Sequence, residues 1–226
     1  MAATVDLEFV GRAEQVDRFR TALAGARASR PSAILVSGDA GVGKTRLLRR
    51  MAELGRADGA RVVTSHCVGL GEIGLPYLPF TDALGQLRSR SEPVEAVIGG
   101  RPALGRLLDA GLVEPETGSA AQAARGQLFD GIAAAIGAGG DADRPLVLMV
   151  EDLHWADPSS RDVLKFLIAR MRSEHLLLVA SYRTDDLHRR HPLRPVLSEL
   201  VRHPRVDHVE LAPFTLVGAT TRSGAL

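Results

Sequence analysis

The hydrophobic positions of this chain follow two different spacings, and their alternation predicts strands interleaved with helices. Continuous apolar runs predict five buried strands, at residues 33–36, 61–67, 146–152, 176–181 and 206–211. Apolar residues three and four positions apart predict amphipathic helices at residues 14–28, 44–56, 159–172 and 195–202. Strands that alternate with helices form βαβ units, in which the strands are parallel. The pattern therefore predicts an α/β fold with a mostly parallel five-stranded sheet and helices on both faces.

The segment from residue 80 to residue 143 has a weaker periodicity, which predicts three further helices. Their apolar positions are Phe80, Leu84 and Leu87, then Leu104, Leu107 and Leu108, then Leu128, Ile132 and Ile136. Glycines and prolines crowd residues 68–79, so we expect a loop there. Asp157 and Pro158 are residue types typical of a helix N-cap and of the first helical position. They predict where the helix at 159–172 begins.

Composition and charge exclude several classes of protein. A chain of 226 residues that is 45% hydrophobic and 24% charged is typical of a globular domain, not of a disordered chain or a coiled coil. Its longest apolar runs are far shorter than the roughly 20 residues of a membrane-spanning helix. A formal net charge of +1 disfavours a dedicated nucleic-acid surface, and a single cysteine, Cys67, excludes an internal disulfide. The N-terminus lacks the apolar segment of a secretory signal, so we expect a cytoplasmic protein with no membrane segment and no DNA-binding element.

Residues 38–45 match the phosphate-binding P-loop pattern of Gly, any four residues, then Gly-Lys-Thr. Glycines let successive backbone N–H groups turn towards phosphate oxygens, and the helix that follows adds the free donors of its N-terminus. Lys44, one of only two lysines among 28 basic residues, is expected to contact the β- and γ-phosphates, and the Thr45 hydroxyl to bind Mg²⁺. The predicted nucleotide-binding residues of this segment are Gly38, Asp39, Ala40, Gly41, Val42, Gly43, Lys44, Thr45 and Arg46.

Two carboxylates, Glu151 and Asp152, end the most apolar of the predicted strands. They lie at its carboxyl end, which is where open α/β sheets bind their ligands. Because successive side chains of a strand point to opposite faces, the two acids are expected to face different ways. One would belong to the Mg²⁺ site with Thr45, and the other would orient or deprotonate the attacking water. The spacing does not decide which acid does which, and we expect their strand to neighbour the one that leads into the P-loop.

Three motifs, in order along the chain, carry a family resemblance. They are VGRAE at residues 10–14, GDAGVGKT at 38–45 and EDLHWADPSS at 151–160. Over residues 8–213 the chain resembles the STAND class of AAA+-related signalling ATPases, and within it the ATPase module of the large ATP-binding LuxR-type transcriptional regulators. The resemblance implies ATP and Mg²⁺ as cofactors, and a slow hydrolysis of ATP that switches the conformation of a regulator.

The same resemblance implies roles for residues outside the P-loop. Arg183, after the strand at 176–181, would contact the γ-phosphate as a sensor-1 residue. His154, Trp155 and Asp157 would couple the acidic strand to its surroundings. The residues implied near the adenine and ribose are Val10, Gly11 and Arg12.

The chain departs from the family in two respects. Glu151 stands where the family usually has Asp, and the extra methylene changes the reach of the carboxylate towards Mg²⁺. The lid, sensor and helix-turn-helix domains of such regulators do not fit within 226 residues. We therefore expect one ATP-binding domain at residues 1–213 and a tail at 214–226, which resembles a short strand of the Holliday-junction branch-migration motor.

The residues leave several functions open. A regulatory ATPase is the first, and a module that binds nucleotide and docks a partner without significant hydrolysis is the second. A truncated fragment, a small-molecule kinase with an acceptor pocket at residues 68–79, and a motor on branched DNA are further alternatives. Apart from ATP or ADP, the expected partners are a second copy of the chain or missing partner domains.

Two surface features favour a purely structural interpretation. His188 and His191 are three positions apart, but no carboxylate or cysteine stands at matching spacing, which disfavours a metal site. Between residues 183 and 205, six arginines accompany three acids, Asp185, Asp186 and Glu199. This mixture favours a solvated helix face.

Overall fold

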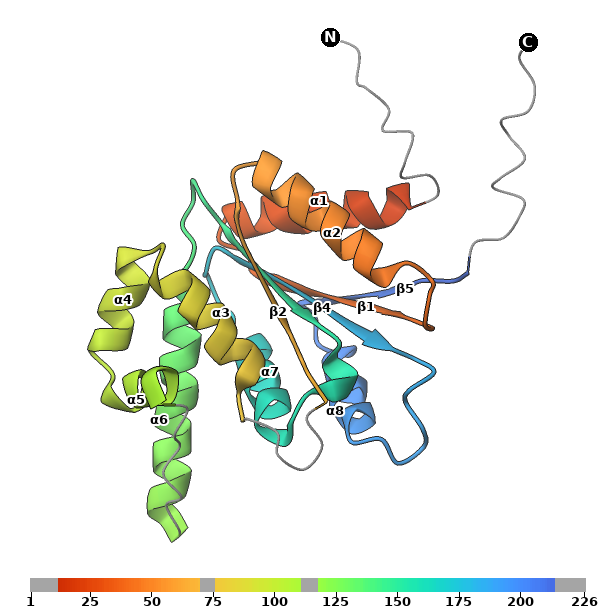
Figure 1. Ribbon diagram of the computed structural model, residues 1–226. Helices are drawn as coiled ribbons and strands as arrows, with labels where there is room; N and C mark the ends of the chain where they lie inside the picture. Colours follow the sequence, from red (N-terminus) through yellow and green to blue (C-terminus); the bar gives the residue numbers. More distant parts are fainter. Residues whose placement is uncertain (1–11, 70–75, 111–117, 214–226) are drawn as a thin grey trace, which may run out of the picture.

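A five-stranded parallel sheet forms the centre of the molecule (Figure 1). The computed structural model describes residues 12–69, 76–110 and 118–213. The strands are β1 (Ser32–Gly38), β2 (Arg61–His66), β3 (Leu146–Glu151), β4 (Leu176–Arg183) and β5 (Val206–Glu210). Their order across the sheet is β2-β3-β4-β1-β5, and every neighbouring pair is parallel. The predicted α/β fold and its five strands are confirmed.

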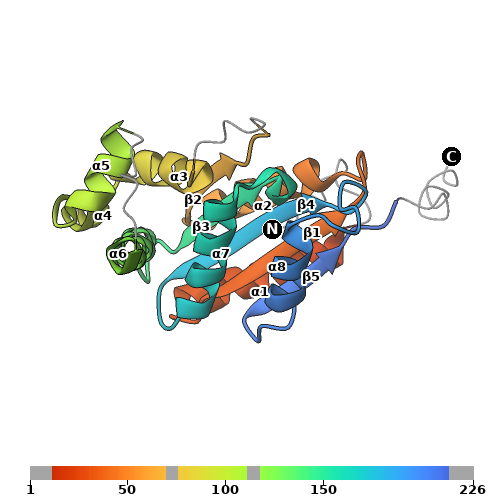
Figure 2. The same ribbon diagram turned by 90° about the horizontal axis from the view of Figure 1, so that it is seen from below.

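Helices cover both faces of the sheet, as predicted (Figures 1 and 2). One face carries α1 (Ala13–Arg27) and α2 (Lys44–Ala57), and the other carries α3 (Leu78–Arg88), α7 (Pro158–Arg170) and α8 (Leu193–Leu200). Three helices pack beside α3, beyond the β2 edge of the sheet. They are α4 (Glu92–Gly99), α5 (Pro102–Ala110) and α6 (Gly118–Gly137).

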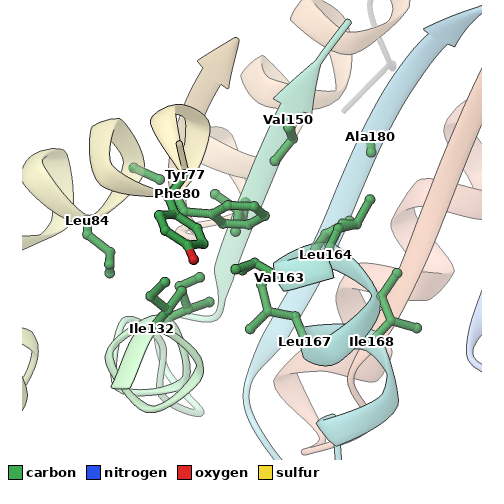
Figure 3. Close-up of a cluster of buried hydrophobic side chains, with 14 of the residues drawn as sticks. Tyr77, Phe80, Leu84, Ile132, Val150, Val163, Leu164, Leu167, Ile168 and Ala180 are labelled. Carbon is green, nitrogen blue, oxygen red and sulfur yellow. The ribbon is translucent and has the colours of Figure 1, made fainter. Parts of the chain in front are cut away.

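The alternation of side chains along each strand divides the buried residues into two cores. In β3, Val147 and Met149 face α1 and α2, whereas Leu146, Leu148 and Val150 face the opposite side. Figure 3 shows the larger core on that side. There, Val163 and Leu167 of α7 lie next to Phe80 of α3 and Ile132 of α6. The helices beside β2 contribute side chains to this same core, so they pack against the β2 side of the sheet.

Helix α7 begins where the sequence predicts. The N-cap residue is Asp157, whose side chain accepts a hydrogen bond from the backbone N–H of Ser160 at 3.0 Å, and Pro158 is the first helical residue. Helix α4 was not predicted. It has eight residues and buries only Val94 and Ile98, too few positions to establish a helical period.

One expectation about the sheet is wrong. The acidic strand β3 does not neighbour β1, because β4 lies between them and pairs with both. Within the described ranges, no helix combines the length and the apolarity that crossing a bilayer requires.

Candidate functional site

The ends of β1, β3 and β4 bring the predicted site residues to one edge of the sheet. The strands are parallel, so their carboxyl ends lie at the same edge, and Gly38 of β1 is in register with Arg183 of β4. The P-loop follows β1, Glu151 ends β3 with Asp152 directly after it, and Arg183 ends β4. Val10 and Gly11 lie outside the described residues, so their expected place near a nucleotide stays a prediction.

The P-loop wraps around the ammonium group of Lys44. Gly41 and Gly43 have φ angles of +78° and +96°, which side chains rarely allow. Lys44 is only 8% exposed, and its Nζ donates hydrogen bonds to the backbone oxygens of Gly38 and Asp39, each at 2.7 Å. The loop therefore holds the lysine at its centre.

The charges around Lys44 come from all three strand ends. Burial lowers the pKa of Lys44, and the positive charge of Arg183 lowers it further. The carboxylates of Asp185, Asp152 and Asp39 oppose this shift. Charged residues of the P-loop, of the end of β3 and of the end of β4 therefore all act on Lys44.

The first turn of α2 supplies Thr45 and Arg46, and both side chains are exposed. A hydroxyl at this position, with the carboxylates at the end of β3, makes a set of hard oxygen donors of the kind that Mg²⁺ prefers. The donor set thus fits the predicted metal, although the roles of these residues stay predictions.

Gly38 carries a further packing constraint, which leads to a first testable prediction. Its φ is +151°, and a Cβ there would lie 2.7 Å from the backbone oxygen of Leu211 and 2.9 Å from a methyl group of Val42. We expect Gly38→Ala to lower the free energy of unfolding by about 2–3 kcal/mol, measured by urea denaturation. Gly85→Ala is the matched control, because a Cβ on this residue of α3 meets nothing within 4 Å. It should stabilise the chain by about 0.5–1 kcal/mol, and an equal loss in both variants would contradict the constraint.

The two acids of β3 have different surroundings. Glu151 is 9% exposed and its Oε1 lies 3.7 Å from Nε2 of His66. Burial raises the pKa of Glu151, while His66 and Arg49 of α2 oppose the shift. Asp152 instead leaves the strand in a left-handed conformation, with φ 60° and ψ 47°, and its N–H donates to the hydroxyl of Ser181 on β4 at 3.2 Å.

His154 lies between the acidic strand and the segment that follows β4. The residue is 5% exposed, with Nε2 3.3 Å from Oδ2 of Asp186 and Nδ1 4.0 Å from Oδ1 of Asp152. Neither ring nitrogen makes a well-aligned hydrogen bond with any described part of the chain. Burial lowers the pKa of His154 although both carboxylates oppose the shift, which favours a neutral ring. The neighbouring Trp155 is 54% exposed.

The segment after β4 makes contacts that the sequence analysis missed. The N–H of Thr184 donates to the oxygen of Gly38 at 3.3 Å, and its hydroxyl donates to Asp39. The N–H of Ala40 donates to Oδ2 of Asp185 at 3.1 Å, and this bond is the main reason why the pKa of Asp185 is lowered. Arg183 lies 3.7 Å from Asp186.

For two of the three acids, Asp185 and Asp186, these contacts correct the expectation of a solvated helix face. Asp185 and Asp186 precede α8 and lie against the candidate site rather than on a helix. The only signal in the sequence was their position directly after Arg183, at the end of a predicted strand.

Arg12 links the P-loop to the end of β5. Its Nη2 donates to the backbone oxygens of Val42 at 3.3 Å and of Ala212 at 2.6 Å. The side chain thus touches the P-loop, while its expected place near the adenine and ribose stays a prediction.

Cys67, His188 and His191 have surroundings that favour a structural role. Cys67 is 4% exposed, and burial raises the pKa of its thiol to about 12, which disfavours a nucleophilic thiolate. The rings of His188 and His191 are 5.5 Å apart in an edge-to-face arrangement. The described residues contain no group of three or more side chains placed to hold a metal ion by themselves.

Comparison with known proteins identifies a family. The family model described as AAA ATPase domain matches residues 8–179, and no curated protein matches the chain. Among solved structures, Cdc6p from Pyrobaculum aerophilum matches with a TM-score of 0.50 and 15% identity, covering 96% of this chain and 49% of that one. A Walker-type ATPase of Pyrococcus abyssi matches with a TM-score of 0.51 and 13% identity, covering 94% of this chain and 56% of that one.

At such identities the two structures show a shared fold alone, and the chain spans about half the length of each. The family model carries the assignment further, because it covers more than half of the chain, including the P-loop and the acidic strand. The chain therefore belongs to the AAA ATPase domain family.

Proposed function

We propose that this chain binds Mg-ATP and hydrolyses it slowly as a conformational switch, as the nucleotide-binding module of a STAND-class, LuxR-type transcriptional regulator. Membership of the AAA ATPase domain family implies nucleotide binding and hydrolysis. The observation that carries the proposal is the P-loop closed around Lys44, with Arg183 in register with Gly38 at the same edge of the sheet. Residues 1–213 would form the ATP-binding domain, and residues 214–226 a separate tail.

The P-loop would bind the phosphates of the nucleotide. Its backbone N–H groups and the N-terminus of α2 supply donors, and the ammonium of Lys44 supplies a positive charge. Thr45 and one of the two acids, Glu151 or Asp152, would hold Mg²⁺, which when bound neutralises phosphate charge. Lys44 would exchange its hydrogen bonds to the loop carbonyls for phosphate oxygens.

We assign the water-orienting role to Asp152 and the metal-site role to Glu151. The negative charge of Asp152 lies close enough to Lys44 to oppose the lowering of the lysine's pKa. Its left-handed backbone and its N–H bond to Ser181 hold it at the turn after β3. Glu151 is more deeply buried and lies next to His66, away from the segment that follows β4.

The segment 183–186 would report the state of the nucleotide. Arg183 is held near Asp186, which in turn lies beside His154 and so beside the acidic strand. A phosphate that attracts Arg183 would weaken the contact of Arg183 with Asp186 and so change the contact of Asp186 with His154. Because Arg183 also pairs with Asp186, it would have to leave this partner to contact a phosphate. This requirement is consistent with a slow turnover.

A module that binds nucleotide without significant hydrolysis is the second candidate. It is favoured by Glu151, because burial raises the pKa of this carboxyl and so opposes the charged form that Mg²⁺ requires.

A titration of thermal unfolding with Mg-ATP, Mg-ADP and Mg-GTP tests the proposal. At 100 times the dissociation constant, we expect Mg-ATP to raise the midpoint by about 5–10 °C, because ligand linkage contributes about 2.7 kcal/mol. Phosphate release above the level of an Asp152→Asn control would support hydrolysis, and its absence with intact binding would select the second candidate. Hydrogen exchange of residues 184–192 should differ between Mg-ATP and Mg-ADP. Identical exchange in both would contradict the switch.

A further inference from the structure

We propose that Asp185 is a specificity-determining residue that holds the Ala40 amide of the P-loop in place of a phosphate oxygen and so sets the affinity for polyphosphate ligands. The proposal rests on the proposed function of the P-loop as a phosphate site. Its observation is the hydrogen bond from the N–H of Ala40 to Oδ2 of Asp185 at 3.1 Å.

Neighbouring residues of β1 and β4 position Asp185 for its contact with Ala40. Gly38 and Arg183 are in register at the ends of β1 and β4, so the two segments that follow them begin side by side. Thr184 then bonds to the P-loop twice, through its N–H to Gly38 and through its hydroxyl to Asp39. These contacts place the carboxylate of the next residue against the amide of Ala40.

A carboxylate oxygen and a phosphate oxygen are both anionic acceptors, so they suit the same N–H donor. Ala40 has one N–H, and a phosphate oxygen can use it fully only after Asp185 has left. The carboxylates of Asp39 and Asp152 also act on Lys44, so Asp185 is one of three negative charges that a phosphate would meet around this lysine. Phosphate binding therefore includes the displacement of Asp185. The free energy needed to break the contact between Asp185 and Ala40 lowers the affinity for the phosphate ligand.

Displacement has a consequence for the neighbouring residues. Asp186 follows directly and contacts both His154 and Arg183. When Asp185 leaves the P-loop, the segment that carries Asp186 loses one of its anchors. Phosphate binding is thereby linked to the contacts of the acidic strand.

The test compares Asp185→Ala with wild type by isothermal titration, using Mg-ATP, inorganic tripolyphosphate and adenosine as ligands. We expect Mg-ATP and tripolyphosphate to bind about fivefold more tightly to the variant, as for the loss of an exposed charged contact. Adenosine has no phosphate and should bind equally to both proteins. Asp185→Asn, whose amide oxygen still accepts a hydrogen bond, should give a smaller gain.

Asp207→Ala is the matched control. It removes the same charge from β5, where Asp207 pairs with Arg18 at 3.4 Å and is in register with Ile34, away from the P-loop amides. If Asp207→Ala raises the affinity for tripolyphosphate as much as Asp185→Ala does, the role of Asp185 is overturned. The same holds if wild type binds tripolyphosphate and Asp185→Ala binds it no more tightly. Either result would leave the phosphate site intact. Failure of all variants to bind any phosphate ligand would overturn the proposed function and this inference together. Binding by Asp185→Ala alone would support the inference in its strongest form.

Discussion

Lys44→Ala is expected to weaken Mg-ATP binding by about 100- to 10,000-fold while leaving the domain folded. Lys44 lies at the centre of the P-loop and carries the positive charge that phosphates would meet. Hydrogen bonds to charged groups contribute about 1.5–3 kcal/mol each, and two such bonds to phosphate oxygens account for the expected loss. The midpoint rise of thermal unfolding with Mg-ATP should disappear in this variant.

The chain offers a matched control in its second lysine. Lys165 lies on α7 and pairs with Glu199 at 2.6 Å. Lys165→Ala changes the net charge equally and should keep the wild-type response to Mg-ATP. A midpoint rise that survives in Lys44→Ala would show that the P-loop does not bind the nucleotide phosphates.

Asp152→Asn is expected to keep Mg-ATP binding and to lower kcat by about 100- to 1,000-fold. A positioned general base contributes roughly 10²- to 10⁴-fold, and the substitution removes a negative charge that acts on Lys44. Asn also tolerates the left-handed backbone of this position, so the turn after β3 should persist. Single-turnover phosphate release with saturating Mg-ATP measures the effect.

Glu151→Gln decides between the two acids. If Glu151 belongs to the metal site, this variant should need more Mg²⁺ for half-maximal turnover, with a smaller loss of kcat at saturating Mg²⁺. Asp162→Asn, an exposed acid of α7 that pairs with Arg125, provides the same change of charge outside the site. Unchanged turnover in Asp152→Asn together with a large loss in Glu151→Gln would exchange the two roles.

The candidate site was only partly predictable from the sequence. Residues 38–45 form a P-loop because a strand, a Gly-rich turn and a helix follow one another directly, and all of this information is local. Asp152 and Glu151 were found for the same reason, at the end of an apolar run. The contact of Asp185 with Ala40 joins residues 145 positions apart, and no spacing along the chain contains it.

The sequence by itself determined the alternation of strands and helices, the N-cap of α7 and the edge of the sheet at which the site lies. These features depend on periods and motifs within short windows, which are the same whatever the order of the strands. Only the tertiary structure decided that β4 separates β1 from β3. That order follows from how the strands and helices pack on both faces, and it places Ser181, Asp185 and Asp186 between the phosphate loop and the acidic strand.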